Sequence, residues 1–119
     1  AAGALSDRRH KHNIETLSNG ALDTVLRLRP VTFEWNDPVD AGMKGKQFGF
    51  IAQEVEEVLP GVVLTQDNAE KTKGLKPSEF IPVLVKAVQE LKAENDALRA
   101  DNDNFRRELD ELKAAMGDE

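Results

Sequence analysis

The stretch that decides the fold runs from Pro77 to Glu119 and reads PSEFIPVLVKAVQELKAENDALRADNDNFRRELDELKAAMGDE. It contains no glycine before Gly117, and its one internal proline, Pro82, falls in the first turn or so, where a helix tolerates proline. These features predict one helix of nearly forty residues. Because such a helix rises ~1.5 Å per residue, it would overhang a small core by several turns.

Apolar side chains recur along this helix with a seven-residue period, which is typical of a coiled coil. The ten residues of this seam are Leu84, Leu91, Leu98, Phe105 and Leu112 at d and Val88, Asn95, Asn102, Leu109 and Met116 at a. We expect identical chains to bury the seam, because the core cannot cover it. Asn95 and Asn102 weaken the seam but penalise slipped registers, since a buried Asn facing Leu lacks a hydrogen-bond partner.

The charges beside the seam predict how the helices lie. The acidic g positions are Glu94, Asp101 and Glu108, and the basic e positions are Lys92, Arg99, Arg106 and Lys113. In a parallel, in-register assembly each g residue meets an e residue of opposite sign, whereas an antiparallel assembly brings like charges together. Each exposed pair contributes only ~0.2–1 kcal/mol, so the charges select orientation while the apolar residues drive association. These patterns leave dimer and trimer open.

Residues 15–76 carry the signals of a small α+β core. Ser18 or Asn19 can cap a helix that Pro30 ends. The periodic face of that helix consists of Leu22, Val25, Leu26 and Arg29. The sequence therefore predicts a short helix at the start of the core.

Short strands and one more helix are expected in the rest of the core. Val31–Trp35 and Gln47–Ile51 alternate as strands around a long turn rich in Pro and Gly, which predicts a hairpin. Gln53–Leu59 is expected to be a helix, and Val62–Leu64 a brief strand before the polar loop 65–74. The expected fold class is α+β and mostly helical, with a small core before the long helix.

Composition excludes several classes of function. With 22 acidic and 16 basic residues, the net charge of −6 gives no electrostatic reason to bind nucleic acid or an anionic membrane. No apolar run approaches the ~20 residues that cross a bilayer, so no membrane partner is expected. There is no cysteine, and His10 and His12 lack a carboxylate pair at zinc-binding spacing. Neither a metal nor another cofactor is expected, and no phosphate-binding glycine loop suggests a nucleotide.

A dense polar cluster near the start of the chain, SDRRHKHN, contains Ser6 and Lys11 five positions apart. Serine is a weak nucleophile unless a base removes its proton, and lysine can do so when burial or neighbouring cations favour its neutral amine. A Ser and Lys pair can therefore catalyse acyl transfer without a histidine. Taken alone, this spacing occurs by chance in many chains, and a solvated loop is the favoured interpretation.

Ser6–Ile14 resembles the S-D-x-R-x-K-x-N-I signature that opens the intramolecular chaperone domain of endosialidase-type phage tailspikes and tail fibres. Similar stretches follow in order at residues 22–35, 49–60 and 81–91. At Gly74–Pro77 the family often has a short strand ending in tyrosine; this chain has no tyrosine, which leaves local pairing there open.

The resemblance implies a homotrimer, with a dimer less favoured, that templates an upstream fibre of the same chain and is then released by its own peptidase activity. It implies that Ser6 is the nucleophile, that Lys11 is the general base and that Leu5–Ser6 is the scissile bond. Asp7, Arg9 and Asn13 match signature positions and are given a supporting role, whereas His10 and His12 fall on variable positions.

This interpretation divides the chain into an upstream remnant (1–5), a chaperone core with the cleavage loop (6–76) and the long helix (77–119). It implies assembly in the host cytoplasm and release of the domain from the mature virion. An oligomerisation module without proteolysis is the alternative. A segment like that of the myelin regulatory factor, which the family also resembles, is disfavoured because the chain has no tether or basic DNA-binding region.

Overall fold

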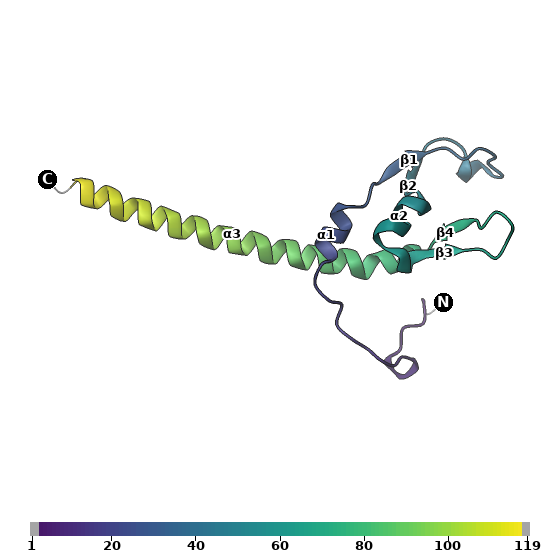
Figure 1. The fold of residues 1–119 in the computed structure, drawn as a ribbon, viewed down its shortest axis with the longest axis horizontal. Helices are drawn as coiled ribbons and strands as arrows, with labels where there is room; N and C mark the ends of the chain where they lie inside the picture. Colours follow the sequence, from purple (N-terminus) through teal and green to yellow (C-terminus); the bar gives the residue numbers. More distant parts are fainter. Residues whose placement is uncertain (1–2, 118–119) are drawn as a thin grey trace.

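The computed structural model describes residues 3–117 and shows a small body from which one long helix projects (Figure 1). The principal extents are 81 × 42 × 31 Å, and the Cα radius of gyration is 23.2 Å. A compact domain of this length has a radius of gyration of about 14 Å. The elongation confirms that the helix overhangs its own core. The predicted upstream remnant (1–5) and the predicted long-helix unit (77–119) include positions 1, 2, 118 and 119, which lie outside the described residues.

The first part of the body is a short helix followed by a hairpin. Helix α1 spans Ala21–Leu26. Strands β1 (Val31–Phe33) and β2 (Gln47–Gly49) pair antiparallel, with Thr32 opposite Phe48, and η2 (Ala41–Met43) lies in the connecting turn. The predicted hairpin is therefore confirmed, although β1 ends before Trp35, whose ring packs edge-on against Phe33 at 4.9 Å.

The second part of the body is helix α2 (Ala52–Val58), turn η3 (Pro60–Val62) and a second hairpin. Strand β3 (Val63–Thr65) pairs antiparallel with β4 (Lys73–Leu75). The polar loop predicted at 65–74 is thus too long at both ends, because Thr65 belongs to β3 and Lys73 and Gly74 belong to β4, and the pairing left open near Gly74 does form. Asn68 closes the loop, because its Oδ1 accepts a hydrogen bond from the backbone N–H of Thr72 at 3.0 Å.

Two details of the predicted first helix are wrong. Neither Ser18 nor Asn19 caps it; the N-cap is Gly20, at φ +114°, and no local side chain bonds the cap. The helix also ends at Leu26, so Arg29 lies beyond it. Leu28 turns in to pack on the core, and Arg29 forms a two-pronged ion pair with Glu54 of α2, at 2.8 and 2.6 Å. Helix α1 therefore ends before the chain reaches Pro30.

The core of the body is small and includes the start of the long helix. Its buried cluster is Val55 of α2, Val62 of η3 and Phe80, with Leu28, Phe50, Leu59, Val63 and Leu75 packed around it. The rings of Phe50 and Phe80 stack with centroids 5.3 Å apart and planes only 3° from parallel. The body and the long helix are therefore one folding unit.

Replacing Phe80 with alanine is expected to destabilise the fold by about 3–5 kcal/mol, because it deletes a buried aromatic ring and leaves a cavity. Phe48 is the matched control: it is 87% exposed, so Phe48→Ala should change stability by less than about 0.5 kcal/mol. Urea unfolding at one fixed chain concentration measures both. Equal losses from the two variants would contradict the assignment of Phe80 to the core.

The long helix is α3, spanning Phe80–Gly117. The 3-10 turn η4 (Pro77–Glu79) leads into it, so the helix begins three residues later than predicted. Pro82 is its third residue, where the missing N–H costs nothing. With 38 residues in α3, the predicted long helix and the mostly helical α+β class are confirmed.

The body occupies one flank of α3. Phe80 and Ala87, seven residues apart at g positions, are the two buried side chains of the described part of α3. Val83 and Glu90, at c, face α1 beside them: Val83 lines a groove with α1, and Glu90 bonds to its first turn. The a and d positions lie on the neighbouring stripe. Intramolecular packing therefore leaves the seam uncovered.

Candidate active site and association surface

The predicted site lies on an arm, residues 3–20, that extends away from the body on the opposite side of α3 from the β1–β2 hairpin (Figure 1). The arm contains one turn of 3-10 helix, η1 (Arg8–His10). The backbone N–H of His10 donates to the carbonyl of Asp7, and that of Lys11 to the carbonyl of Arg8. This turn bends the chain so that the residues on either side of it approach each other.

Ser6 and Lys11 are the two residues that the turn brings together. The Nζ of Lys11 donates a hydrogen bond to the Oγ of Ser6 at 2.7 Å. Both side chains are exposed in the single chain. At this distance a neutral lysine amine would instead accept the hydroxyl proton, which is the geometry that general-base activation of serine requires. Leu5, on the other side of the predicted scissile bond, is 77% exposed.

Asp7 and Arg9 hold the turn. The Oδ1 of Asp7 accepts the backbone N–H of Arg9 at 2.9 Å, which caps η1, and the guanidinium of Arg9 binds the same carboxylate at 3.1 and 2.7 Å. The side-chain bonds from Arg9, followed by its backbone N–H, lower the pKa of Asp7. The same contact raises the pKa of Arg9. Arg9 is therefore engaged with Asp7 and organises the loop.

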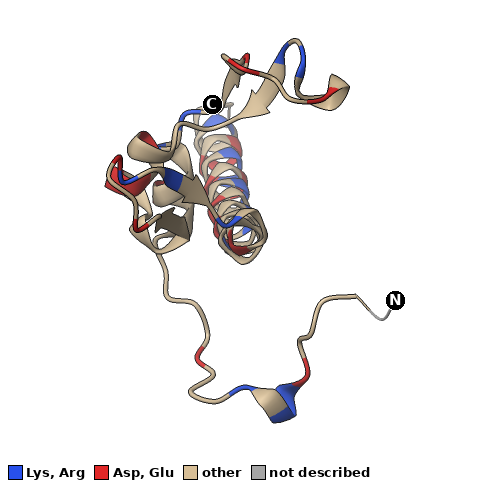
Figure 2. Cartoon of the chain, turned by 90° about the vertical axis from the view of Figure 1, so that its right-hand side faces the viewer, with Lys and Arg blue, Asp and Glu red and all other residues tan. Residues whose placement is uncertain are grey.

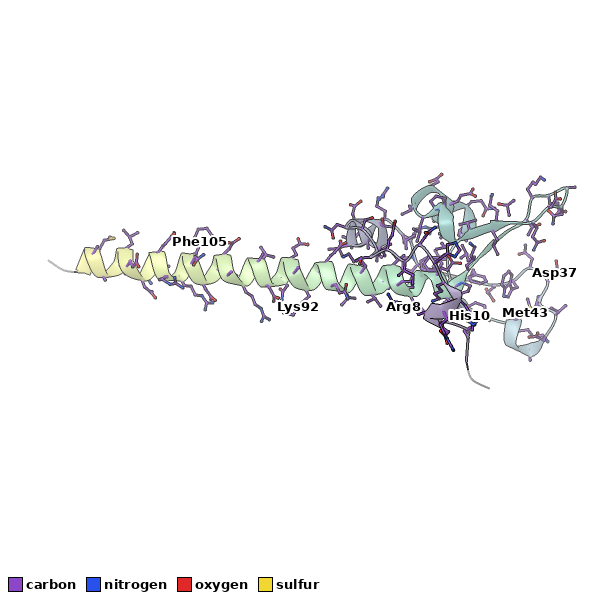
Figure 3. The ribbon with its side chains drawn as sticks, turned by 90° about the horizontal axis from the view of Figure 1, so that it is seen from below. Arg8, His10, Asp37, Met43, Lys92 and Phe105 are labelled. Carbon is purple, nitrogen blue, oxygen red and sulfur yellow. The ribbon has the colours of Figure 1, made fainter. Side chains whose placement is uncertain are left out.

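Asn13 supports the loop through its backbone conformation. Its φ of +53° lies in the left-handed region, where asparagine is tolerated and branched residues are not. The chain therefore bends at Asn13, two residues after Lys11. His10 and His12 have exposed side chains on this loop, and Figure 3 labels His10 beside Arg8 on the arm. The described contacts assign neither histidine to the Ser6–Lys11 pair.

The role of Glu90 was not predicted from the sequence. Its Oε1 accepts the backbone N–H groups of Gly20 (2.9 Å) and Ala21 (3.2 Å), and its Oε2 accepts that of Leu22 (3.1 Å). These bonds, that of Leu22 first, lower the pKa of Glu90. A carboxylate of α3 thus caps α1 in place of a local side chain. A partner nearly seventy positions away is invisible to local sequence patterns.

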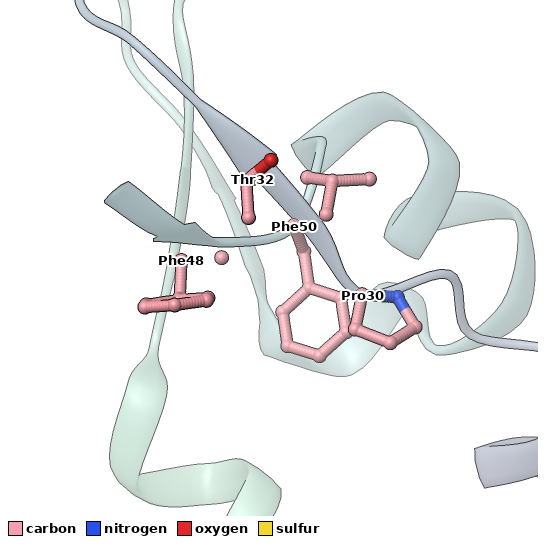
Figure 4. Close-up of a pocket in the computed structure, with 6 residues that line it drawn as sticks. Pro30, Thr32, Phe48 and Phe50 are labelled. Carbon is pink, nitrogen blue, oxygen red and sulfur yellow. The ribbon is translucent and has the colours of Figure 1, made fainter. Parts of the chain in front are cut away.

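A groove of about 440 Å³ lies on the β1–β2 hairpin (Figure 4). It is lined by Pro30, Val31, Thr32, Phe48, Gly49 and Phe50. This lining offers no acid, base or charged group for chemistry. Within residues 3–117 there is no cluster of three metal-ligating side chains, and no described helix is long and apolar enough to cross a bilayer.

The seam forms a continuous exposed stripe on α3. Every one of its ten residues is exposed, from Leu84 at 45% to Met116 at 71%. Figure 3 shows Phe105 on the part of the helix that projects beyond the body. An apolar stripe of this length on a single chain is typical of a surface that another chain covers.

Figure 2 looks along α3 and shows acidic and basic positions, red and blue, on its ribbon. Lys92, the first basic e position, has Ala87 at the preceding g position, where α1 covers it. Lys92 instead pairs with Asp96 one turn on in its own helix, at 2.6 Å. The later e and g residues are exposed and have no such body beside them.

Comparison with known proteins identifies the arm and most of the body. Residues 6–64 match the sequence model of a peptidase family described as chaperone of endosialidase. The matched segment begins at Ser6 and includes both hydrogen-bonded side chains of the loop.

Two curated relatives extend the similarity. They are the Long tail fiber protein Gp37 of Enterobacteria phage M1 and the protein of the same name from Enterobacteria phage Ox2. Each is 32% identical over 96 residues, which is 79% of this chain but only 38% of the relative. Membership of the matched family implies a self-cleaving peptidase in general terms. The chain belongs to the family of endosialidase chaperones.

Proposed function

We propose that this chain forms a parallel homotrimer through α3, templates the folding of an upstream tail fibre, and is then released by cleaving its own Leu5–Ser6 bond. The observation that carries the proposal is the uncovered seam, which runs from Leu84 to Met116 without a break in its heptad pattern. The two relatives of this chain are named as long tail fibre proteins, and these names support a fibre as the upstream partner.

Association through α3 fits the needs of a fibre. The strands of a β-rich fibre pair only after several chains meet, so such folding is slow. Chains held side by side by a coiled coil have a high effective concentration of one another. The pairs Glu94–Arg99, Asp101–Arg106 and Glu108–Lys113 would align the chains in parallel and in register. Three chains are preferred to two because the family resemblance implies a trimer.

The Ser6–Lys11 geometry supports a chemical route for release. The neutral Lys11 amine takes the proton of the Ser6 hydroxyl as Oγ attacks the carbonyl carbon of Leu5. The C–N bond of Leu5–Ser6 then breaks, and the lysine ammonium returns its proton to the departing Ser6 nitrogen. Leu5 is left as an ester on Ser6 Oγ. Water hydrolyses this ester, which gives a Leu5 carboxylate and a domain that begins with a free Ser6 amine.

Cleavage would make fibre assembly irreversible. A fibre that has lost its template cannot refold through it, so unfolding becomes limited by a kinetic barrier. Assembly would take place in the host cytoplasm, and the freed domain would be absent from the mature virion. A fibre carrying the uncleavable domain should therefore unfold at a different rate from the cleaved fibre, and equal rates would contradict this part of the proposal.

Two measurements on the wild-type protein test the proposal. Light scattering should give a solution mass of three chains, and mass spectrometry should detect a product that begins at Ser6. A trimer that stays uncut would favour the alternative, an oligomerisation module without proteolysis. The exposure of Ser6 and Lys11 in the single chain also favours that alternative. A stable single chain would contradict the whole proposal.

The left-handed backbone of Asn13 leads to a prediction about cleavage. Asn13→Gly should cleave at close to the wild-type rate, since glycine adopts this conformation freely, whereas Asn13→Val should cleave at least about tenfold more slowly, because a branched residue there costs roughly 1–3 kcal/mol. Time courses of the Ser6 product measure both. Glu15→Val, at an ordinary φ, is the control. Equal slowing by glycine and valine would mean that the Asn13 side chain acts instead.

A further inference from the structure

Glu90 joins the long helix to the root of the arm. Its carboxylate binds three consecutive backbone N–H groups, those of Gly20, Ala21 and Leu22, at 2.9–3.2 Å. Gly20 is both the N-cap of α1 and the last residue of the arm. A single side chain of α3 therefore fixes the point along the helix at which the arm leaves the body.

No other polar contact holds the arm between that point and the Ser6–Lys11 loop. Among the described residues, positions 12–19 make no hydrogen bond or ion pair. Leu17 lies beside Ile81, Pro82 and Val85 in a shallow apolar groove, but it remains 46% exposed. The Glu90 contact is thus the one directional constraint on where the arm starts within this part of the chain.

The start of the arm decides where the cleavage loop is delivered. From Glu90 at position c, the arm crosses the back of α3 past Pro82 and Lys86 to Val85 at position e. In a parallel bundle, the e flank of one helix faces the g flank of its neighbour. The arm is therefore directed toward the next chain of the assembly, whose g flank carries its own body.

We propose that Glu90 is a positioning residue for self-cleavage: by holding Gly20–Leu22 it fixes the root of the arm on α3, so that the Ser6–Lys11 loop reaches the boundary with the neighbouring chain. This inference rests on the proposed function. It gives a physical link between assembly and cleavage, because the same helix that carries the seam also sets the direction of the arm.

The test compares Glu90→Ala and Glu90→Gln with the wild-type chain. Glu90→Ala should slow formation of the Ser6 product at least about tenfold while the solution mass stays unchanged. Glu90→Gln keeps an oxygen for the N–H groups of Gly20 and Ala21, so its rate should lie between the two. Amide hydrogen exchange at residues 20–22 should accelerate in the same order, since these N–H groups lose their acceptor.

Two controls separate positioning from general damage. Glu111→Ala, at the same heptad position but on the exposed part of α3, should cleave like wild type. Val55→Ala weakens the core at a site away from the arm. The cleavage rates of Val55→Ala and Glu90→Ala are compared at temperatures where the folded fraction of the two variants is the same. The inference is overturned if Val55→Ala slows cleavage as much as Glu90→Ala, if Glu90→Ala cleaves normally, or if its solution mass falls. An uncut wild-type trimer would overturn both this inference and the proposed cleavage.

Discussion

Ser6→Ala is expected to abolish formation of the released domain, lowering the rate of cleavage by about a thousandfold or more, and to leave the solution mass unchanged. Alanine removes the only atom that can attack the Leu5 carbonyl in the proposed route, and loss of a nucleophile typically costs at least this factor. The exposed hydroxyl contributes nothing to the core, so folding and association should persist. Mass spectrometry and light scattering on the same sample measure the two quantities.

Lys11→Arg sharpens this prediction. Arginine keeps the positive charge near Ser6 but cannot give up its proton in a protein, so it cannot serve as the base. We therefore expect Lys11→Arg to be as inactive as Lys11→Ala. The controls are His10→Ala and His12→Ala on the same exposed loop, which should cleave at close to the wild-type rate. An active Lys11→Arg variant, or an inactive histidine variant, would assign the base to a different residue.

Leu98→Asp is expected to convert the proposed trimer into single chains at micromolar concentration. Leu98 occupies a d position, and burial of one leucine side chain contributes about 1.5–3 kcal/mol, so three chains together lose enough to weaken association at least about a thousandfold. Three carboxylates facing one another in the seam add repulsion and a desolvation cost. Light scattering across a concentration series measures the change in mass.

Ala100→Asp is the matched control for Leu98→Asp. It adds the same charge two residues away, at an f position on the outer face of the predicted bundle, and should leave the mass unchanged. If Leu98→Asp also leaves the mass unchanged, the seam is not the association surface. Since the body packs on the other flank of α3, the circular-dichroism signal of the body should survive in both variants.

The long helix and the first hairpin could be predicted from sequence because their signals are local and repeated. The heptad pattern of α3 and the alternation around β1 and β2 each depend on near neighbours. Strand β4 was missed because Lys73–Leu75 has no alternation of its own, and its pairing with β3 depends on a loop closed by Asn68. Such a strand forms through its partner, so its own residues carry little information.

The residues of the candidate site were also only partly predictable from the sequence. Ser6, Lys11, Asp7, Arg9 and Asn13 lie within eight consecutive positions, and the family signature identified them. Glu90 could not be found, because its partners are backbone groups that any residues would provide. The predicted caps Ser18 and Asn19 were plausible by residue type, but a distant carboxylate bonds the first turn of α1 instead. Contacts between a side chain and a remote backbone leave no pattern in sequence.

Helix α3 packs on its own body only as far as Glu90, and every described residue from Leu91 onward is exposed. The distal segment can therefore be exchanged without disturbing Phe80 or its neighbours. A helix that favours a two-stranded or four-stranded coiled coil could be grafted at Leu91 with the heptad positions kept in register. The same body would then assemble in two or four copies. On the proposed association through α3, the grafted helix would set how many fibre chains meet, independently of the body that packs around Phe80.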